Sequence, residues 1–300
     1  MKLFSQKILP NGRKHIFFCG IKIASYFKRN IVPVYMFKSD VLKYKAFIGC
    51  DNIKTVILGS SHGRDGYIPN GRSFNLANSS QDLYRAYKVY EYLTKQKSKC
   101  ESLRNIVLFW SVFHPGLQLE KTQEYLKCIP YKLFYDAQYI CEFPISDKKY
   151  LRRLYRQFKK TTVPNNYRGK SLWDINHDGE ITSDLVSKHI KNTKRNNGQI
   201  QYVQNILDLA RKYKHKLYIV LPPYRTDYLK CLPDYKEIYF ELFDFLDKNP
   251  DVTLLDLQHD KDFNDGDFDS ADHCNERGAE KLTKKIDSFL DNIVEVDQTE

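Results

Sequence analysis

Side chains that together can transfer an acyl group lie near opposite ends of this sequence. Ser61 follows a short apolar run at Thr55–Leu58, and near the other end His273 stands close behind Asp269 and Asp272. A serine on a tight strand-to-helix turn exposes its hydroxyl, an imidazole can take the proton of that hydroxyl, and a carboxylate can fix the imidazole tautomer. The pattern therefore predicts Ser61 as a nucleophile and His273 as its general base.

Two carboxylates compete to orient the imidazole. Asp272 directly precedes His273 in the chain, whereas Asp269 lies four residues before it. Neighbouring side chains on an extended backbone point in opposite directions, so an adjacent carboxylate is badly placed to reach the ring. We therefore expect Asp269 to orient His273. The alternatives are Asp272 and a serine–histidine pair without a carboxylate.

These side chains need strands that end together at one edge of a sheet. Short apolar runs predict five strands, and helical spacing of apolar residues predicts four helices. The strands are 54–59, 73–77, 106–110, 216–221 and 252–255, and the helices are 80–92, 198–213, 234–247 and 276–290. Their alternation predicts a parallel sheet with helices on both faces. Residues 115–195, rich in Tyr, Lys and Arg, interrupt it, and we expect an insertion over the carboxyl edge, where such sheets bind ligands.

Three short motifs occur along the chain in the same order as the conserved sequence blocks of a known family. Gly59-Ser60-Ser61 corresponds to a Gly-Asp-Ser turn with Ser in place of Asp, Asn75–Ser80 corresponds to Asn-Leu-Gly-x-x-Gly, and His273–Ala279 carries a His-x-Asn-x-x-Gly-Ala context. The sequence thus resembles the SGNH hydrolase superfamily, also called GDSL-type esterases, over about residues 54–115 and 198–292. The resemblance implies a three-layer α/β/α sandwich with a five-stranded, flavodoxin-like parallel sheet in residues 51–300.

The same resemblance implies further site roles. The backbone N–H groups of Ser61 and Ser80 would stabilise an oxyanion. The family's third block supplies an Asn donor, but residues 111–114 read Ser-Val-Phe-His here, so Asn78 or His114 would have to replace that donor. The side chains expected to contact the substrate are His62, His114 and Arg225. This route needs no metal and no organic cofactor.

The composition agrees with one large domain plus an extension. The chain has 300 residues, 42% of them hydrophobic, which is enough for a buried core. Its seven cysteines include no Cys-x-x-Cys pair, so we expect reduced thiols in a cytoplasmic protein rather than a disulfide framework or a zinc site. No uncharged apolar run is long enough for a membrane-spanning helix, and no signal peptide is recognisable.

Most of the net positive charge lies at the start of the chain. The formal charge of the whole chain is +11, and residues 1–45 hold ten bases and one acid, a net charge of +9. Apolar residues interleave with these bases, and the runs 16–24 and 31–37 have strand-like composition. We interpret residues 1–50 as a basic arm. An anionic membrane surface is its possible partner, a solvated face packed on the domain is the alternative, and nucleic acid is not expected.

A second resemblance bears on the substrate. Residues 7–15 and 20–23 resemble leader segments of bacterial capsule and lipopolysaccharide biosynthesis proteins, glycosyltransferases among them. With the SGNH-like motifs, this implies a serine ester hydrolase or O-acetyltransferase that acts on acyl groups of a bacterial surface polysaccharide, at the inner face of the cell membrane. The alternative is a non-catalytic SGNH-like protein that binds glycan or serves as a scaffold in a biosynthetic complex.

One further run matches the first half of a calcium-binding loop. Asp174–Ile181 reads Asp-x-Asn-x-Asp-Gly-x-Ile, which places oxygen ligands at the required spacing. The twelfth position is Leu185 rather than Glu, and Asp184 falls one residue early. We therefore favour a plain Asp-Gly turn over a calcium site.

Overall fold

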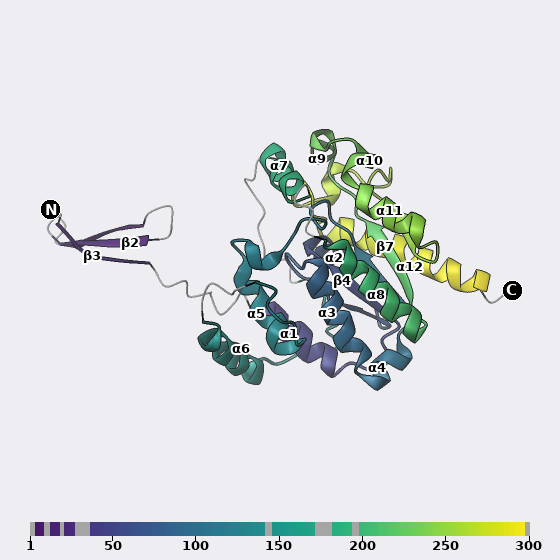
Figure 1. Cartoon of the computed structure of the whole chain (residues 1–300), viewed down its shortest axis with the longest axis horizontal. Helices are drawn as coiled ribbons and strands as arrows, with labels where there is room; N and C mark the ends of the chain where they lie inside the picture. Colours follow the sequence, from purple (N-terminus) through teal and green to yellow (C-terminus); the bar gives the residue numbers. More distant parts are fainter. Residues whose placement is uncertain are drawn as a thin grey trace.

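A five-stranded parallel sheet forms the centre of the molecule (Figure 1). The computed structural model describes residues 4–8, 13–18, 21–27, 37–141, 146–171, 182–193 and 198–297. The strands of this sheet are β4 (Thr55–Gly59), β5 (Ser73–Asn75), β6 (Asn105–Phe109), β7 (Lys216–Leu221) and β8 (Thr253–Asp256). They lie in the order β5-β4-β6-β7-β8, the flavodoxin-like order when numbered within this sheet. The five strands predicted from the sequence are confirmed.

Each inner strand sends alternate side chains into two separate cores. In β4, Val56 and Leu58 belong to the larger hydrophobic cluster and Ile57 belongs to the smaller one. The helices that cover the larger cluster are α1 (Lys38–Ile48), α3 (Leu83–Thr94), α8 (Ile200–Tyr213) and α11 (Phe240–Lys248). The opposite face is covered by α2 (Ser61–Gly66) and α12 (Glu276–Asp297), which pack on each other. The predicted three-layer α/β/α sandwich is therefore confirmed, and burial on both faces explains the continuous apolar runs of the strands.

The winding of the sheet reverses between β4 and β6. Strand β4 pairs in parallel with β5 on one side and with β6 on the other. The helix after β4 lies on one face of the sheet, and the helix after β5 lies on the other. A crevice at such a reversal, outside the carboxyl ends of the strands, is where open α/β sheets bind ligands. Ser61 directly follows the β4–α2 turn and lies at this point.

The basic arm ends earlier than the sequence suggested. Strands β1 (Phe4–Ile8), β2 (Arg13–Phe18) and β3 (Ile21–Phe27) form an antiparallel sheet of their own, and the strand-like run at 16–24 is divided between β2 and β3. Helix α1, by contrast, packs into the main core through Phe37, Val41 and Phe47. The expected boundary at residue 50 is therefore wrong, because the apolar stripe of α1 is part of the α/β domain. Residues 31–36 lie outside the described part of the chain.

The segment 115–195 is mainly helical where the structure describes it. Its elements are η2 (Leu119–Lys121), η3 (Tyr125–Lys127), α5 (Cys128–Phe134), α6 (Lys148–Lys160) and α7 (Thr182–Thr193). Helices α5 and α6 pack beside α1, and α7 packs against α9 (Thr226–Cys231), which follows β7. The short elements α4 (Lys97–Ser102), α10 (Tyr235–Ile238) and η4 (Asp265–Asp267) complete the described fold. The candidate calcium loop at 174–181 lies outside the described residues.

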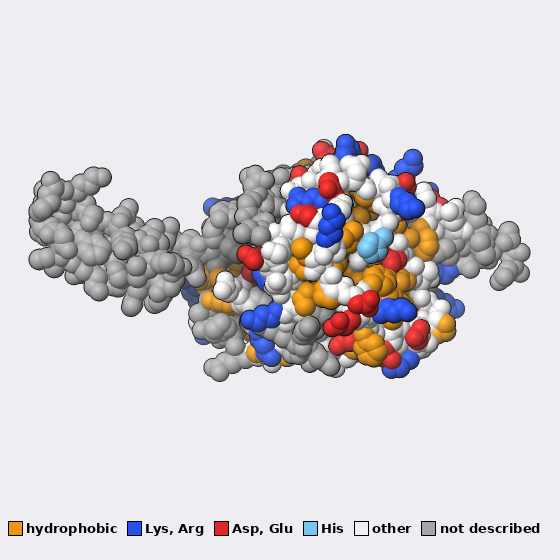
Figure 2. Space-filling model, turned by 90° about the horizontal axis from the view of Figure 1, so that it is seen from above, with side chains coloured by type: hydrophobic (Ala, Val, Ile, Leu, Met, Phe, Trp, Pro, Cys, Tyr) orange, Lys and Arg blue, Asp and Glu red, His pale blue; other side chains and the backbone are white. Residues whose placement is uncertain are grey.

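Charges of both signs are mixed on one face of the molecule. On the face seen in Figure 2, Lys and Arg side chains lie interspersed with Asp and Glu. Among the described helices, none has both the length and the apolar character needed to cross a bilayer.

Candidate active site

The turn after β4 places Ser61 at the carboxyl edge of the sheet. Gly59 has a φ of 115°, and a Cβ at this position would lie 2.5 Å from the carbonyl oxygen of Phe109 on the adjacent strand, so only glycine fits. The Gly59 N–H donates to Oε1 of Gln81 at 2.8 Å, which fixes the turn. Ser60 then caps α2, and Ser61 is the first residue of that helix.

Ser61, His273 and Asp272 form a continuous hydrogen-bonded chain. The Oγ atom of Ser61 lies 2.7 Å from Nε2 of His273, and Nδ1 of the same ring lies 2.8 Å from Oδ1 of Asp272. The His273 side chain is 11% exposed and the Asp272 side chain is 2% exposed, while Ser61 is half-buried. This is the arrangement of a nucleophile, a general base and an orienting carboxylate.

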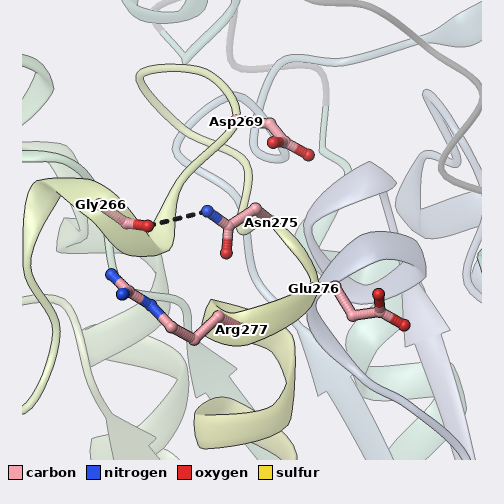
Figure 3. Close-up of a pocket in the computed structure, with 5 residues that line it drawn as sticks. All are labelled: Gly266, Asp269, Asn275, Glu276 and Arg277. Atoms are coloured by element: carbon pink, nitrogen blue, oxygen red, sulfur yellow. Dashed lines mark hydrogen bonds between the residues drawn. The ribbon is translucent and has the colours of Figure 1, made fainter.

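The expectation that Asp269 orients His273 is wrong. The backbone N–H of Asp269 donates to the carbonyl oxygen of His273 at 2.9 Å, and its side chain lines a neighbouring cavity (Figure 3). The hydroxyl of Ser270 accepts hydrogen bonds from the backbone N–H groups of Asp272 and His273, at 3.4 and 3.2 Å. This serine-based turn folds the loop so tightly that two adjacent side chains meet, which an extended backbone would prevent.

Ser270 is a site residue that the sequence reasoning missed. It stands three residues before His273, where the family resemblance would place an Asp. Its Oγ atom lies 3.0 Å from Oδ1 of Asp272 and 3.1 Å from Nδ1 of His273. The carboxylate is thus supplied two positions further along the loop, and a hydroxyl at the family's position supports it.

The carboxylate and the imidazole stabilise each other's charged forms. Burial by itself would raise the pKa of Asp272, but the neighbouring rings of His273 and His62 hold that pKa well below its usual range. Burial would likewise lower the pKa of His273, but the Asp272 carboxylate outweighs it and the net shift is upward. Asp272 is therefore ionised at neutral pH, and His273 is a stronger base than a free imidazole.

His62 binds the second oxygen of Asp272. Its Nε2 lies 3.1 Å from Oδ2 of Asp272, and its Nδ1 lies 2.6 Å from Oγ of Ser111, which in turn lies 2.6 Å from Oγ of Ser60. Burial lowers the pKa of His62 despite the carboxylate, so the neutral ring donates through Nε2–H and accepts through Nδ1. The His62 side chain is only 1% exposed. The prediction that it contacts substrate is wrong, because its role is to support Asp272.

The sequence predicted the backbone N–H groups of Ser61 and Ser80 as the oxyanion donors. Within the described part of the chain, the N–H groups of Ser61 and Ser80 have no hydrogen-bond acceptor. Ser80 has a φ of 57°, the left-handed conformation that the family's glycine adopts readily. The Ser80 hydroxyl bonds Glu124, which holds this loop against η3. Both positions agree with an oxyanion role, which stays a prediction.

Asn78 faces α1 rather than supplying the missing third donor. Its amide nitrogen bonds Asp40 in α1, and its backbone N–H donates to the carbonyl oxygen of Gly59 at 3.0 Å. Its amide oxygen accepts from the N–H of Ser79 at 3.0 Å. These contacts use Asn78 to fasten the loop after β5, so its assignment to the oxyanion hole is not supported by the geometry.

His114 is also unavailable to a substrate. The residue is fully buried. Its Nδ1 accepts from the N–H of Ser111 at 2.9 Å, and its Nε2 donates to the carbonyl oxygen of Gln81 at 3.2 Å. Burial lowers the pKa of His114 to about 3, so the ring is neutral and both of its nitrogens are occupied. The predicted substrate contact is wrong, since His114 links the loop after β6 to the loop before α3.

Arg225 follows the carboxyl end of β7. Its guanidinium forms two hydrogen bonds with Asp227, at 2.8 and 2.7 Å, and its backbone N–H donates to the carbonyl oxygen of Ala271 at 3.0 Å. The second contact ties the loop that carries His273 to the sheet. The Arg225 side chain is 30% exposed, and its contact with a substrate stays a prediction.

A buried ion pair that the sequence did not indicate lies beside the triad. Arg64 bonds Asp65 through two parallel contacts of 2.7 and 2.5 Å, and Asp65 also accepts from the hydroxyl of Ser171 at 2.6 Å. The negative charge of Asp65 adds to that of Asp272 in raising the pKa of His273, while Arg64 opposes it. Adjacent opposite charges are too common in sequences to have marked this pair.

Three side chains at the centre of the site are of types that bind metal ions. His62, Asp272 and His273 each offer one ligand atom, and these atoms lie within 4.8 Å of one another. Imidazole and carboxylate are common zinc ligands. In the structure both rings bond the carboxylate directly, so the three groups satisfy one another as a hydrogen-bonded network.

An open pocket of about 470 Å³ adjoins the loop that carries His273. It is lined by Gly266, Asp269, Asn275, Glu276 and Arg277 (Figure 3). An internal hydrogen bond of 2.9 Å from Asn275 to the carbonyl oxygen of Gly266 fixes one wall. Ser61, His273 and Asp272 are not among the lining residues, so the pocket is separate from the triad itself.

The fold and the site define an α/β sandwich with a serine–histidine–aspartate chain at its switch point. No protein-family model matches the sequence, and no curated protein matches it.

Proposed function

We propose that the chain is a serine ester hydrolase or O-acyltransferase of the SGNH type. The observation that carries the proposal is the hydrogen-bonded series from Ser61 through His273 to Asp272, with distances of 2.7 and 2.8 Å. The nucleophile follows β4, and the imidazole and carboxylate come together from a loop close to the C-terminus. The run Gly59-Ser60-Ser61-His62-Gly63 also satisfies the Gly-x-Ser-x-Gly pattern of an α/β-hydrolase elbow. The support for the SGNH type is therefore the five-stranded, flavodoxin-like sheet and the single loop that supplies both Asp272 and His273.

The geometry supports an acyl-enzyme mechanism. Ser61 Oγ forms a bond to the acyl carbon while its proton passes to Nε2 of His273, and the Asp272 carboxylate stabilises the imidazolium. The N–H groups of Ser61 and Ser80 stabilise the oxyanion. When the bond to the leaving oxygen breaks, that oxygen takes the proton from Nε2. Water or a sugar hydroxyl then repeats the sequence on the acyl-serine, giving hydrolysis or transfer.

The acyl acceptor or leaving group in this proposal is a sugar of a bacterial surface polysaccharide. The support is the likeness of the first residues to leaders of polysaccharide biosynthesis proteins. The open pocket beside the loop that carries His273 also offers the side chains of Asp269, Asn275 and Arg277, which can hydrogen-bond sugar hydroxyls. The corresponding location is the cytoplasmic side, at the inner face of the membrane. No bound cofactor takes part in this route.

One observation favours the non-catalytic alternative, in which the scaffold binds glycan without chemistry. Ser111 stands in the block where the family supplies an Asn donor, and it is fully buried in the network with His62 and Ser60. The oxyanion would therefore have two backbone donors and no side-chain donor. Loss of one donor typically costs about 10²- to 10³-fold in turnover, which weakens catalysis without abolishing it.

The test is covalent labelling with a serine-reactive fluorophosphonate. We expect the wild-type chain to be labelled at Ser61 and the Ser61→Ala variant to lose the label. Ser98→Ala, at an exposed position in α4, is the matched control and should label like wild type. Labelling of Ser61→Ala at the wild-type rate, or an unreactive wild type with an intact fold, would rule out the proposed nucleophile.

A further inference from the structure

Helix α6 carries an unusually dense positive charge. Its sequence, Lys148–Lys160, contains seven Lys and Arg residues and no acid. The preceding acid, Asp147, pairs with Lys132 of α5 at 2.9 Å. Within the described part of the chain, no acidic side chain forms an ion pair with a base of α6.

The charge is confined to one side of the helix. The side chains that face the core are Tyr150, Leu151, Leu154 and Phe158. At about 100° per residue, the opposite half of the helix consists of positions 148, 149, 152, 153, 155, 156, 159 and 160. These are the seven bases and Tyr155, which is 52% exposed. The inward face is thus satisfied by packing on α1 and α5, and the outward face is cationic along its whole length.

This outward face differs in charge from the face of the molecule that Figure 2 shows. The face in Figure 2 mixes charges of both signs, which keeps local repulsion small. In α6, by contrast, like charges recur at spacings of three and four residues, as in Lys149–Arg152–Arg156–Lys159, and such pairs are destabilising. A partner of opposite charge would relieve this repulsion.

We propose that α6 is a docking surface for an anionic phospholipid bilayer. The outward face is a straight rod of about 20 Å, which suits a flat charged surface. Tyr155 lies in this face with the Lys159 ammonium 4.7 Å from its ring centroid, and exposed tyrosine among bases is typical of membrane interfaces. The basic arm enters the α/β domain at α1, and α6 packs on α1. The arm and α6 are therefore two weak anchors on one chain, and such anchors reinforce each other.

The test is co-sedimentation of the full chain with vesicles. The probe is phosphatidylcholine vesicles with and without phosphatidylserine, and the variant carries Lys149→Gln, Arg152→Gln, Arg156→Gln and Lys159→Gln, all at exposed positions. The matched control carries Lys95→Gln, Lys97→Gln, Lys230→Gln and Lys236→Gln, which removes the same charge from exposed positions elsewhere. Thermal melting confirms that each variant is folded.

We expect wild type and control to bind the phosphatidylserine vesicles and the α6 variant to bind them on the order of 10²- to 10³-fold more weakly. Binding should also fall as salt rises from about 10 mM to about 150 mM and the Debye length shrinks from about 30 to about 8 Å. If a folded α6 variant binds like the control, or if wild type ignores phosphatidylserine while binding poly(U), the proposal is overturned. These outcomes do not depend on whether Ser61 is reactive.

Discussion

At the scale of single residues, the chemistry of the site depends on which groups form hydrogen bonds with Asp272. Its two oxygens are bound by two different imidazoles, one of which is the proposed base. His273 gains basicity from the carboxylate, whereas His62 stays neutral and donates to it. The two histidines therefore act on the same carboxylate in different ways, and substitutions can separate their effects.

Asp272→Asn should lower turnover of 4-nitrophenyl acetate on the order of 10⁴-fold, because an amide cannot stabilise the imidazolium. Asp269→Asn is the matched control and should stay close to wild type, since its side chain does not contact the ring. Equal effects of the two substitutions would show that the carboxylate does not orient His273 during turnover.

The pH dependence gives a second test at this scale. His273 must be neutral to accept a proton, so kcat/KM should fall as pH drops through a value above the free-imidazole pKa of about 6.5. Asp272→Asn removes the negative charge that raises the pKa of His273, so its acidic limb should move to lower pH. A limb that does not move would mean that another group controls the profile.

His62→Ala should move the acidic limb of the kcat/KM profile to higher pH, opposite to the effect of Asp272→Asn. Without the Nε2–H donor, the charge of Asp272 is less stabilised and attracts a proton on His273 more strongly, so the pKa of His273 should rise. Loss of a hydrogen bond to a charged group should also lower kcat about 10- to 100-fold. His62→Gln, which keeps a donor, should recover part of the rate. An unchanged profile in His62→Ala would contradict its role as a positioning residue.

At the scale of elements, the strand-to-helix turn is the part that sequence chemistry specifies most tightly. Gly59 combines a positive φ with close backbone approach, and its N–H is held by Gln81 from the loop before α3. The nucleophile is placed by this backbone geometry, and the hydroxyl of Ser60 adds the helix cap and the contact with Ser111.

Gly59→Ala should therefore destabilise the protein by about 2–4 kcal/mol, because the added Cβ meets a carbonyl oxygen at 2.5 Å in a strained conformation. Gly71→Ala is the matched control, since nothing lies within 4 Å of the added Cβ, and its effect should stay within about 0.5 kcal/mol. Urea unfolding of both variants measures the difference. A stability of Gly59→Ala equal to that of Gly71→Ala would show that the strand can shift to make room.

Strands could be predicted from the sequence because burial on both faces leaves an uninterrupted apolar run, and the bounds 216–221 coincide with β7. The pairing of Ser61 with His273 was also predictable, because Ser61 directly follows a strand and His273 lies just before the last predicted helix, in the order that the family resemblance implies. The choice between Asp269 and Asp272 was not, since it depends on hydrogen bonds of the Ser270 hydroxyl to the loop backbone. The role of His62 depends on contacts far along the chain and leaves no local pattern.

At the scale of the whole molecule, the end of the basic segment does not coincide with the start of the α/β domain. The net charge drops near residue 45, but the fold begins at Phe37, because α1 combines core residues with Lys43 and Lys45. Lys43 is itself buried and donates to the carbonyl oxygen of Ala77 at 2.5 Å. A division of the chain by composition therefore cuts through the α/β domain.

Truncation tests this boundary. A chain that starts at Phe37 should keep the stability of the α/β domain, because it retains α1. A chain that starts at Asp51 should lose about 5 kcal/mol or become insoluble, since Phe37, Val41 and Phe47 no longer cover the core. Thermal melting compares the two chains. Equal melting temperatures of the two chains would show that α1 does not stabilise the α/β domain and that the arm extends to residue 50.

The contacts around Asp272 also have a topological consequence. Ser61 and His62 are consecutive residues, and so are Asp272 and His273. The two dipeptides are joined crosswise, since the first residue of each bonds the second residue of the other. Peptide bonds and hydrogen bonds thus close a ring between two distant parts of the chain. The loop that carries Asp272 and His273 cannot detach without also releasing the turn that carries Ser61 and His62. The nucleophile and its general base should therefore be lost together in local unfolding.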